Sequence, residues 1–290
     1  QIPINKIERI IITNKSTSIS NYLIYICSEH KIDIDFISNN EPYALLTFYK
    51  NISHELHLAQ LKILLSPNGL LIAKNIHIAK SKNQINLLKY FNQRRSDKAL
   101  EKIIDTMIKL SIKIVDAENA HSLMGIEGVI SSHYWNGFKH IIQKEDFIRT
   151  HKESKDTINQ ALNYAYGILY NRVQATLIKE GLNIYYPFLH AYMANKPTLV
   201  FDIIEPFRQP IVDREIISIL TKKQKLSQQN GLLDEKTKKI IIQHIQSRLG
   251  SFTNTKYGKT TYQNLIGFDA NELKRDILSK KIHKFFIAKY

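Results

Sequence analysis

The chain has 290 residues, 43% of them hydrophobic, and a formal net charge of +15 at pH 7. No run approaches the roughly 18 consecutive apolar residues of a membrane span, and the single cysteine, Cys27, excludes both a disulfide framework and a cysteine-based zinc site within one chain. We therefore expect no membrane partner, a reducing cytoplasmic setting, a buried Cys27, and one large or two ordinary domains.

The first 75 residues favour β-strands. The runs IERIIIT, DIDFIS and YALLTFY are short and rich in Ile, Phe, Tyr and Thr, and SISNYLIYICSEH between the first two predicts a short helix. In KIDIDFIS, Ile32, Ile34 and Phe36 alternate with Asp33 and Asp35. This alternation predicts a half-buried strand whose aspartates lie on a solvated face.

From about residue 80 onward, apolar residues recur at helical intervals. This spacing occurs in AKSKNQINLLKYFNQRR, ALEKIIDTMIKLSIKI, GIEGVISSHYWNGFKHII and DTINQALNYAYGILYNRVQATLIKEGL, where Gly181 is the expected C-cap. Residues 215–290 predict further helix, rich in lysine and interrupted near GSFTNTKYGKTTYQ. The predicted fold is α+β, with an N-terminal β-rich domain over residues 1–76 and a larger α-helical domain over residues 80–290.

Positive charge is concentrated in two arms. Residues 76–115 carry nine Lys and Arg against three Asp and Glu, a net charge of +6, and residues 211–290 carry sixteen against seven, a net charge of +9. The segment between them, residues 116–210, has a net charge of −1. Charge of this kind is typical of proteins that meet nucleic acid or an anionic membrane, although charge runs also form plain solvated faces.

The acidic centre holds the candidate site residues, and each one taken alone has a structural explanation. Asp202 and Glu205 in FDIIEP have the spacing of a capping box, with Asp202 as the N-cap. His190 follows apolar residues, as packed core histidines do, and Glu127 lies near a helix start, where the dipole favours a carboxylate. Together, however, two carboxylates and one imidazole make a ligand set for Mg²⁺ or Mn²⁺.

Three sequence blocks connect these residues to a known arrangement. The blocks are GIEGVISSHYWNGF, ALNYAYGILYNRVQATLIKEGLNIYYPFLHA and KPTLVFDIIEPFRQPIVDR. In order and separation they resemble the catalytic core of the CRISPR-associated spacer-acquisition integrase, the universal catalytic subunit of CRISPR adaptation. The resemblance extends more loosely over nearly the whole chain.

The resemblance implies roles for individual residues. Glu127, His190 and Glu205 match the catalytic metal ligands of the family, and Asp202 matches an acidic position that supports the site or the helix start. Asn163 and Tyr164 match a Leu-Asn-Tyr signature and are expected to organise the cleft. The basic residues expected to contact DNA are Lys80, Arg94, Arg95, Arg172 and Arg208. Pro187 departs from the pattern, since the family commonly has Gly before Phe-Leu-His.

The implied function is metal-dependent phosphoryl transfer on DNA. A spacer precursor's 3′-hydroxyl would attack a phosphodiester at the edge of a CRISPR repeat, with Mg²⁺ or Mn²⁺ as the cofactor. The implied partners are double-stranded DNA, a second copy of the chain bound mainly through residues 1–75, a small ferredoxin-like adaptation subunit, and a fused or associated reverse transcriptase; the implied location is the prokaryotic cytoplasm. Two alternatives stay open: a hydrolytic metal-dependent nuclease in DNA repair, and a non-catalytic basic subunit that binds nucleic acid.

Overall fold

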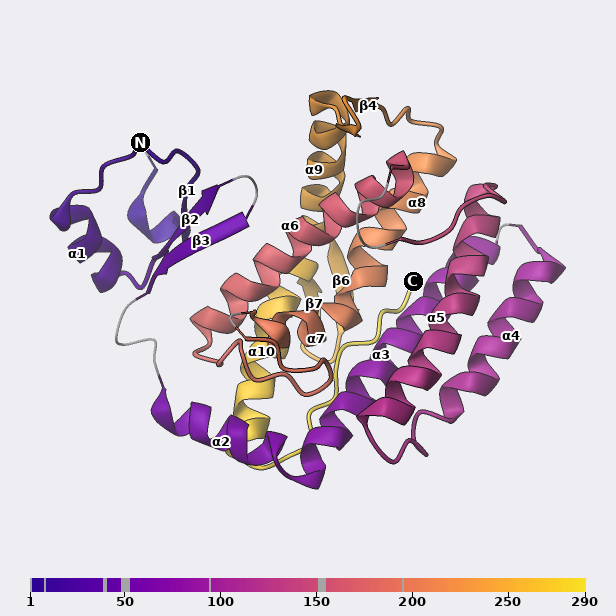
Figure 1. Cartoon of the computed structure of the whole chain (residues 1–290), viewed down its shortest axis with the longest axis horizontal. Coiled ribbons are helices and arrows are strands. Elements are labelled where there is room, and N and C mark those ends of the chain that lie inside the picture. Colours follow the sequence, from indigo (N-terminus) through magenta and orange to yellow (C-terminus); the bar gives the residue numbers. More distant parts are fainter. Residues whose placement is uncertain are drawn as a thin grey trace.

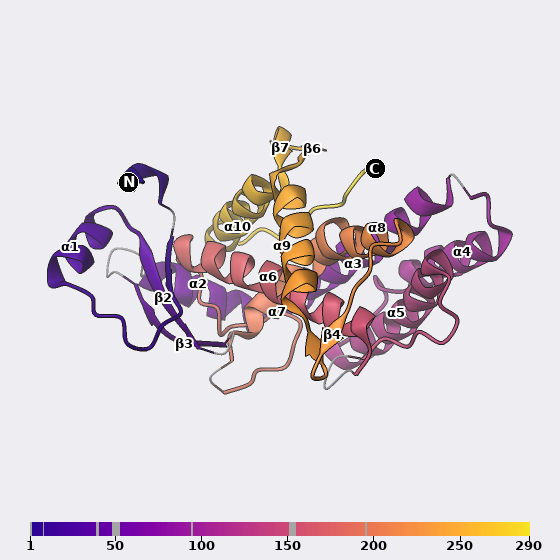
Figure 2. The same ribbon diagram turned by 90° about the horizontal axis from the view of Figure 1, so that it is seen from above.

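The structure is a computed structural model, and it describes residues 2–7, 9–38, 41–47, 53–93, 95–150, 155–194 and 196–290. A small unit of three strands and one helix lies at one end of the long axis, and a larger helical body occupies the rest (Figures 1 and 2). The α+β fold predicted from the sequence is therefore confirmed.

The N-terminal unit is a mixed three-stranded sheet with one helix. Its elements are the short 3₁₀ turn η1 (Ile4–Lys6), β1 (Arg9–Ile12), α1 (Asn21–Glu29), β2 (Asp33–Ser38) and β3 (Glu41–Leu46). The strand order is β1-β2-β3, with β1 parallel and β3 antiparallel to β2. The unit has its own small core around Cys27, Ile32 and Ile34, so the expected burial of the cysteine is confirmed.

The aspartates of β2 correct one expectation. Asp33 and Asp35 are each only 6% exposed, and Arg9 of β1 forms an ion pair with Asp35. Asp33 and Arg9 also line a cavity of about 420 Å³ together with residues of α6 (Thr157–Lys179) and α10 (Tyr262–Leu278). The predicted solvated face is wrong because this side of the sheet faces the helical body.

The helical body begins earlier in the chain than expected. Its first four helices are α2 (His54–Leu64), α3 (Pro67–Asn92), α4 (Lys98–Ile112) and α5 (Ala120–Ile142). Ser66 caps α3 and Pro67 begins it, a favourable start because the first helical N–H has no partner within the helix. The predicted boundary between residues 76 and 80 falls within this continuous helix, so the change from strands to helices comes between β3 and α2.

The central helices carry the acidic centre of the sequence. The long helix α6 ends at Lys179 with Glu180 as its cap, and Gly181, expected as the C-cap, follows one residue later with a positive φ of 79°. A loop then leads to α7 (Thr198–Phe207), the π-helical segment η3 (Arg208–Asp213) and α8 (Arg214–Thr221), which follow one another without a break. Pro210 in η3 has no N–H for the carbonyl of Pro206, and Asn83 of α3 donates to that carbonyl instead at 2.7 Å.

The C-terminal part completes the helical body. It comprises β4 (Gln228–Gln229), β5 (Leu232–Leu233), α9 (Glu235–Gly250), β6 (Phe252–Thr255), β7 (Gly258–Thr261), α10 and a final segment without regular structure. The expected interruption near residue 255 is the β6–β7 hairpin. One continuous core of buried apolar side chains joins α2 through α10 to this final segment.

Among the described residues, no single helix has the length and hydropathy to cross a membrane. Within that part of the chain, α2 and α3 taken together have the length and composition of a membrane span, but they are bent by 87° where they meet.

Candidate functional site

The centre of the candidate site is a buried ion network between α3, α5 and α7. The ammonium group of Lys80 lies 2.6 Å from Oε1 of Glu127 and 2.8 Å from Oε2 of Glu205. Ser131, one turn after Glu127, donates to the same Glu127 oxygen at 2.6 Å. Two carboxylates that are far apart in the sequence therefore share one cation.

The charges around Glu205 keep it ionised. Its residue is 2% exposed, and Arg208 lies 3.2 Å from its second oxygen. Burial alone would raise the pKa of Glu205, but the charges of Arg208 and Lys80 outweigh burial and hold the pKa at about 2. The pKa of Glu127 is lowered as well, because Lys80 and Ser131 outweigh the effect of its burial.

His190 is fixed by Asp202, and this arrangement corrects the expected N-cap. Asp202 lies in the middle of α7, which begins at Thr198, and it is fully buried. Its carboxylate accepts hydrogen bonds from the backbone N–H groups of Phe188, Leu189 and His190, and Oδ1 lies 2.6 Å from Nδ1 of His190. The capping interpretation is wrong because the carboxylate satisfies a different segment, the loop that carries His190.

A second histidine belongs to this centre, and the sequence analysis missed it. His77 lies one helical turn before Lys80 on α3 and is 1% exposed, and within the described part of the chain neither ring nitrogen has a hydrogen-bond partner. Burial, and then the charge of Lys80, lowers its pKa to about 4, and the charges of Glu127, Glu205 and His190 also act on it. The sequence contains one signal for this histidine. His77 and Lys80 are three residues apart in a helix turn that is otherwise apolar.

A cavity of about 290 Å³ opens onto one side of the ion network. Lys80, Glu127, Ser131, Arg149 and Arg208 are among the residues that line it, whereas His190 and Glu205 are not. The guanidinium groups of Arg149 and Arg208 also lie over the ring of Tyr166 at 5.6 and 5.0 Å. The cavity is therefore a positively charged recess with one carboxylate of the pair in its wall.

Buried groups behind the cavity hold its arginines in place. The Tyr134 hydroxyl donates to Asp213 of η3 at 2.6 Å, and the Tyr166 hydroxyl donates to the other Asp213 oxygen. Arg149 donates to Asn163 at 2.7 Å. The predicted supporting residue Asn163 thus positions a cavity arginine.

The other predicted residues lie in different surroundings. Tyr164 packs against the core. Arg95 donates to the carbonyl of Ile141 at 2.6 Å, near the end of α5. Arg172 lines the separate cavity between the sheet and the helical body. Arg94 lies outside the described residues, and Lys80, expected as a DNA contact, is a buried partner of the two glutamates.

By residue type, the donor set of this centre fits a divalent cation, although among the described residues the ligand atoms of Glu127, His190 and Glu205 do not form a group within 4.8 Å of one another. Two carboxylates share a single ammonium ion, so a cation position between them already exists. The bond from Nδ1 of His190 to Asp202 leaves Nε2 available, and a carboxylate on the other ring nitrogen is the usual companion of a metal-binding histidine. Carboxylate oxygens with one imidazole suit Mg²⁺ or Mn²⁺.

Comparisons with known proteins agree on one family. Residues 1–247 match the family described as CRISPR associated protein Cas1. A CRISPR-associated protein Cas1 of Methanobrevibacter ruminantium is 32% identical over 263 residues, which cover 83% of this chain and 77% of the relative. A CRISPR-associated endonuclease Cas1 of Saccharolobus solfataricus is 31% identical over 215 residues, which cover 72% of this chain and 59% of the relative.

Solved structures share the fold. A Cas1 protein from Thermotoga maritima superimposes with a TM-score of 0.77 at 20% identity, covering 96% of this chain and 88% of that one. A casposase bound to its integration product gives 0.74 at 24% identity, covering 95% and 84%. A chain of a Cas6-RT-Cas1–Cas2 complex gives 0.77 at 21% identity, where the match covers 97% of this chain and 32% of that longer one. The match over residues 1–247 and the relatives above 30% identity show that this chain belongs to the Cas1 family of CRISPR-associated proteins.

Proposed function

We propose that this protein joins the 3′-hydroxyl ends of a spacer precursor to CRISPR repeat DNA, with Glu127, His190 and Glu205 as its catalytic metal ligands. As a Cas1 protein, the chain is a nuclease or integrase of CRISPR adaptation. The observation that carries the residue assignment is the buried cation position between Glu127 and Glu205, which Lys80 occupies at 2.6 and 2.8 Å.

The proposed reaction replaces one phosphodiester with another. The precursor's 3′-oxygen forms a new bond to phosphorus, the bridging P–O bond of the repeat strand breaks, and the repeat strand leaves with a free 3′-hydroxyl. When bound, Mg²⁺ or Mn²⁺ supplies positive charge that offsets the charge on the phosphorus centre. No separate energy source is needed, because the number of phosphodiesters is unchanged.

The chain's own residues prepare the site. Asp202 holds His190 through four hydrogen bonds, three of them to the backbone of its loop. Arg208 pairs with Glu205 and lines the cavity, where its remaining N–H groups could bind a phosphate oxygen. Arg149, held by Asn163, offers a second guanidinium in the same wall.

The proposed partners follow from family membership. DNA is the expected substrate, and the similar solved structures include Cas1–Cas2 assemblies with a reverse transcriptase and a casposase on its product. We extend the proposal to a small ferredoxin-like adaptation subunit, an associated reverse transcriptase, and a prokaryotic cytoplasmic location.

The homodimer is a further part of the proposal. The N-terminal unit exposes the apolar side chains of Ile11, Tyr22, Tyr25 and Tyr43, of which Tyr22 is 72% exposed. Replacement of Tyr22 and Tyr25 by Asp should convert a dimer to a monomer in analytical ultracentrifugation. Dimerisation that is unchanged by both this pair and Tyr43→Asp would contradict the assignment.

A hydrolytic nuclease is the second candidate, because the Saccharolobus relative is named an endonuclease. It would use the same residues with water in place of the 3′-hydroxyl. The third hypothesis is a non-catalytic basic subunit, whose binding of nucleic acid would need no metal.

A strand-joining assay separates the candidates. The wild-type chain, the partner subunit, Mn²⁺ or Mg²⁺, a duplex with free 3′-hydroxyls and a repeat-containing target should give a joined product. The product should disappear with His190→Ala, with Glu205→Gln and with a blocked 3′ end, whereas His121→Ala and Glu118→Gln, both exposed, serve as matched controls. Shortened strands alone would favour the hydrolytic nuclease, and joining without metal would overturn the assignment of the three ligands.

A further inference from the structure

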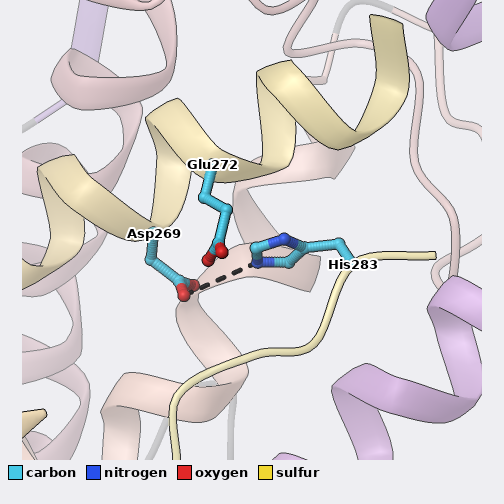
Figure 3. Close-up of side chains that lie close together, drawn as sticks. All are labelled: Asp269, Glu272 and His283. Atoms are coloured by element: carbon cyan, nitrogen blue, oxygen red, sulfur yellow. Dashed lines mark ion pairs between the residues drawn. The ribbon is translucent and has the colours of Figure 1, made fainter. Parts of the chain in front are cut away.

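A second cluster of titratable side chains lies where α10 meets the C-terminal segment. Asp269 and Glu272 project from neighbouring turns of α10, and His283 faces them from the segment that follows the helix (Figure 3). One ligand atom from each of the three lies within 4.8 Å of the other two. The cluster shares no residue with the cavity around Glu127.

The distance between Asp269 and His283 is unusual for a hydrogen bond. Oδ1 of Asp269 lies 3.5 Å from Nε2 of His283, beyond the usual 2.7–3.2 Å of such bonds. Two ligands on one tetrahedral zinc ion, with bonds of about 2.0–2.1 Å, lie about 3.3 Å apart. The observed separation matches a shared cation better than a direct bond.

The ring of His283 is oriented as in a metal site. Its Nδ1 lies 2.8 Å from Oδ2 of Asp276, so Nδ1–H donates to that carboxylate and Nε2 points toward Asp269. A carboxylate on the far nitrogen is the usual companion of a metal-bound imidazole. With a neutral ring, the lone pair of Nε2 faces the carboxylate of Asp269, an arrangement that a cation between them would stabilise.

The carboxylate of Asp269 is buried without hydrogen bonds. The residue is 1% exposed, and neither of its oxygens has a hydrogen-bond partner among the described residues. His283 is fully buried, and its Nε2 also lacks one. Buried carboxylates are normally paired or bound to a metal; Asp269 lies in an ion pair with His283 at 3.5 Å without a direct hydrogen bond, and its oxygens have the chemistry of metal ligands.

Glu272 completes the set from a more exposed position. Its oxygen Oε2 accepts from Lys256 and from the Tyr257 hydroxyl on the β6–β7 hairpin. The Lys256 side chain is 48% exposed and can turn into solvent, whereas Oε1 is not used by these two donors. A cavity of about 500 Å³, lined by Asp269, Tyr257 and Phe285, provides a route for a small ion.

We propose that Asp269, Glu272 and His283 bind a divalent transition-metal ion, Zn²⁺ by donor set, at a site separate from the catalytic centre. Two carboxylate oxygens and one imidazole nitrogen are common zinc ligands, and a water molecule would complete the tetrahedron.

The ion would fix the C-terminal segment onto α3. The carbonyl of His283 accepts from Asn75 at 2.7 Å, and the N–H of Ala288 donates to Asn83 at 2.7 Å. Asn83 is the residue that satisfies the carbonyl of Pro206. The site therefore lies in the segment that is hydrogen-bonded to α3, and through Asn83 this segment is linked to α7.

The competing explanation is a proton in place of the metal. An imidazolium between Asp269 and Asp276 would also balance the charge, and these two carboxylates raise the pKa of His283 although burial alone would lower it. The two explanations differ in whether the chain binds zinc at this place.

The test measures zinc on the full chain in a His190→Ala background, which weakens the proposed catalytic site. After treatment with a chelator and dialysis against Zn²⁺, mass spectrometry should find one ion per chain. Asp269→Asn, which keeps the shape of the side chain, should weaken zinc binding roughly tenfold or more. Glu235→Gln, an exposed carboxylate on α9 with 79% side-chain exposure, is the matched control.

A second readout follows the C-terminal segment itself. Zn²⁺ should raise the melting temperature of the apo chain and slow amide hydrogen exchange over residues 283–288, and Asp269→Asn should remove both effects. Absence of bound zinc, or equal binding by Asp269→Asn and Glu235→Gln, would overturn the proposal in favour of the imidazolium. Because catalysis is not measured, this outcome is independent of whether the chain joins DNA.

Discussion

Asp202 illustrates how one buried carboxylate can organise a loop for chemistry. Its two oxygens accept four hydrogen bonds, and one of these fixes the imidazole of His190. The three backbone donors belong to consecutive residues that lack the partners of a regular helix or strand. The same group therefore stabilises the loop and orients its functional side chain.

Replacement of Asp202 by Asn should destabilise the chain strongly. An amide has one oxygen where the carboxylate has two, so two of the four donors lose their acceptor, at about 1–3 kcal/mol each. We expect a loss of about 2–6 kcal/mol in urea unfolding, together with loss of joining. Asp105→Asn, on the exposed face of α4, is the control. A loss below about 1 kcal/mol, in the range of a helix cap, would contradict this role.

Lys80 is the residue whose removal should reveal the proposed cation position. Without its ammonium group, Glu127 and Glu205 face each other with one fewer positive charge, and the loss of one partner from a buried ion pair costs about 3–5 kcal/mol. Lys80→Met should therefore lower the metal-free melting temperature.

Mn²⁺ should then restore more stability to Lys80→Met than it adds to the wild type, because the metal no longer competes with the ammonium. The exposed Lys82→Met on the same helix provides the control. Equal shifts with Mn²⁺ in all three proteins would show that the two glutamates do not share a metal.

His77 should make metal-free stability depend on pH in an accessible range. Burial and Lys80 lower its pKa from 6.5 to about 4 in the folded chain. The unfolded chain therefore takes up a proton near pH 6.5 that the folded chain refuses until about pH 4, so stability falls as the pH decreases through this window. The contribution is up to about 1.4 kcal/mol per pH unit. His77→Leu should flatten the fall between pH 6.5 and 4 in urea titrations with chelator, and an unchanged slope would contradict a buried neutral imidazole.

At the scale of elements, helix packing brings the functional residues together. Gly137 of α5 lies against α3 and α4, and a Cβ atom built there would lie 2.7 Å from Cδ1 of Leu88. This close approach lets α5 lie against α3, which places Glu127 beside Lys80. The irregular segment η3, which contains Pro210 and follows Pro206, then turns Arg208 and Asp213 toward the same centre. Wide helical turns of this kind are frequent at functional sites.

Gly137→Ala should therefore destabilise the chain even though alanine favours a helix. Overpacking of a close core contact costs about 1–3 kcal/mol, which exceeds the gain of up to about 1 kcal/mol in helix propensity. Gly125→Ala on the same helix meets nothing within 4 Å and should be neutral or stabilising. Chemical denaturation of both variants gives the comparison, and a stabilised Gly137→Ala would show that α5 has room to move.

The sequence predicts helices and strands better than it predicts the tertiary contacts between them. The helical spacing of DTINQALNYAYGILYNRVQATLIKEGL predicts an apolar stripe of Ile158, Leu162, Ala165, Leu169 and Val173. In α6 the last four are fully buried and Ile158 is half-buried, because helical spacing depends only on local residues. The burial of Asp33 and Asp35 could not be predicted in this way, since it depends on a helical body that follows later in the chain.

In the candidate site too, contacts between distant segments could not be predicted from the local sequence. Glu127 and Glu205 were identified by motif blocks, and they share Lys80. Lys80 itself could not be told apart from the other lysines of a basic arm, because its role depends on two helices that meet it in space. Asp202 was misjudged because D-x-x-E spacing is the same in a capping box and in the middle of a helix.

At the scale of the whole molecule, the charges of the buried centre balance one another, whereas the excess positive charge lies in other segments. The buried centre is balanced locally, with Lys80 and Arg208 against Glu127 and Glu205. The surplus of +15 therefore resides elsewhere, mainly in residues 211–290, which contribute +9, and in residues 76–115, which contribute +6 with Lys80 included. These segments include α4, α9 and α10, which lie on different sides of the helical body (Figures 1 and 2). Such a distribution suits a long duplex that wraps or crosses the body more than a small anionic ligand.

DNA binding should consequently depend strongly on salt and little on sequence. Phosphate contacts release counterions from the duplex, and six contacts give a slope of roughly −5 in a plot of log affinity against log salt concentration. Fluorescence anisotropy with a labelled duplex between 50 and 300 mM salt measures this slope, and a shuffled duplex of equal length is the control for sequence. We expect nearly equal slopes for the two duplexes, because backbone contacts carry no sequence information. A flat salt response would place the binding energy in uncharged contacts, and a steep response confined to one sequence would indicate base recognition that the basic arms do not explain.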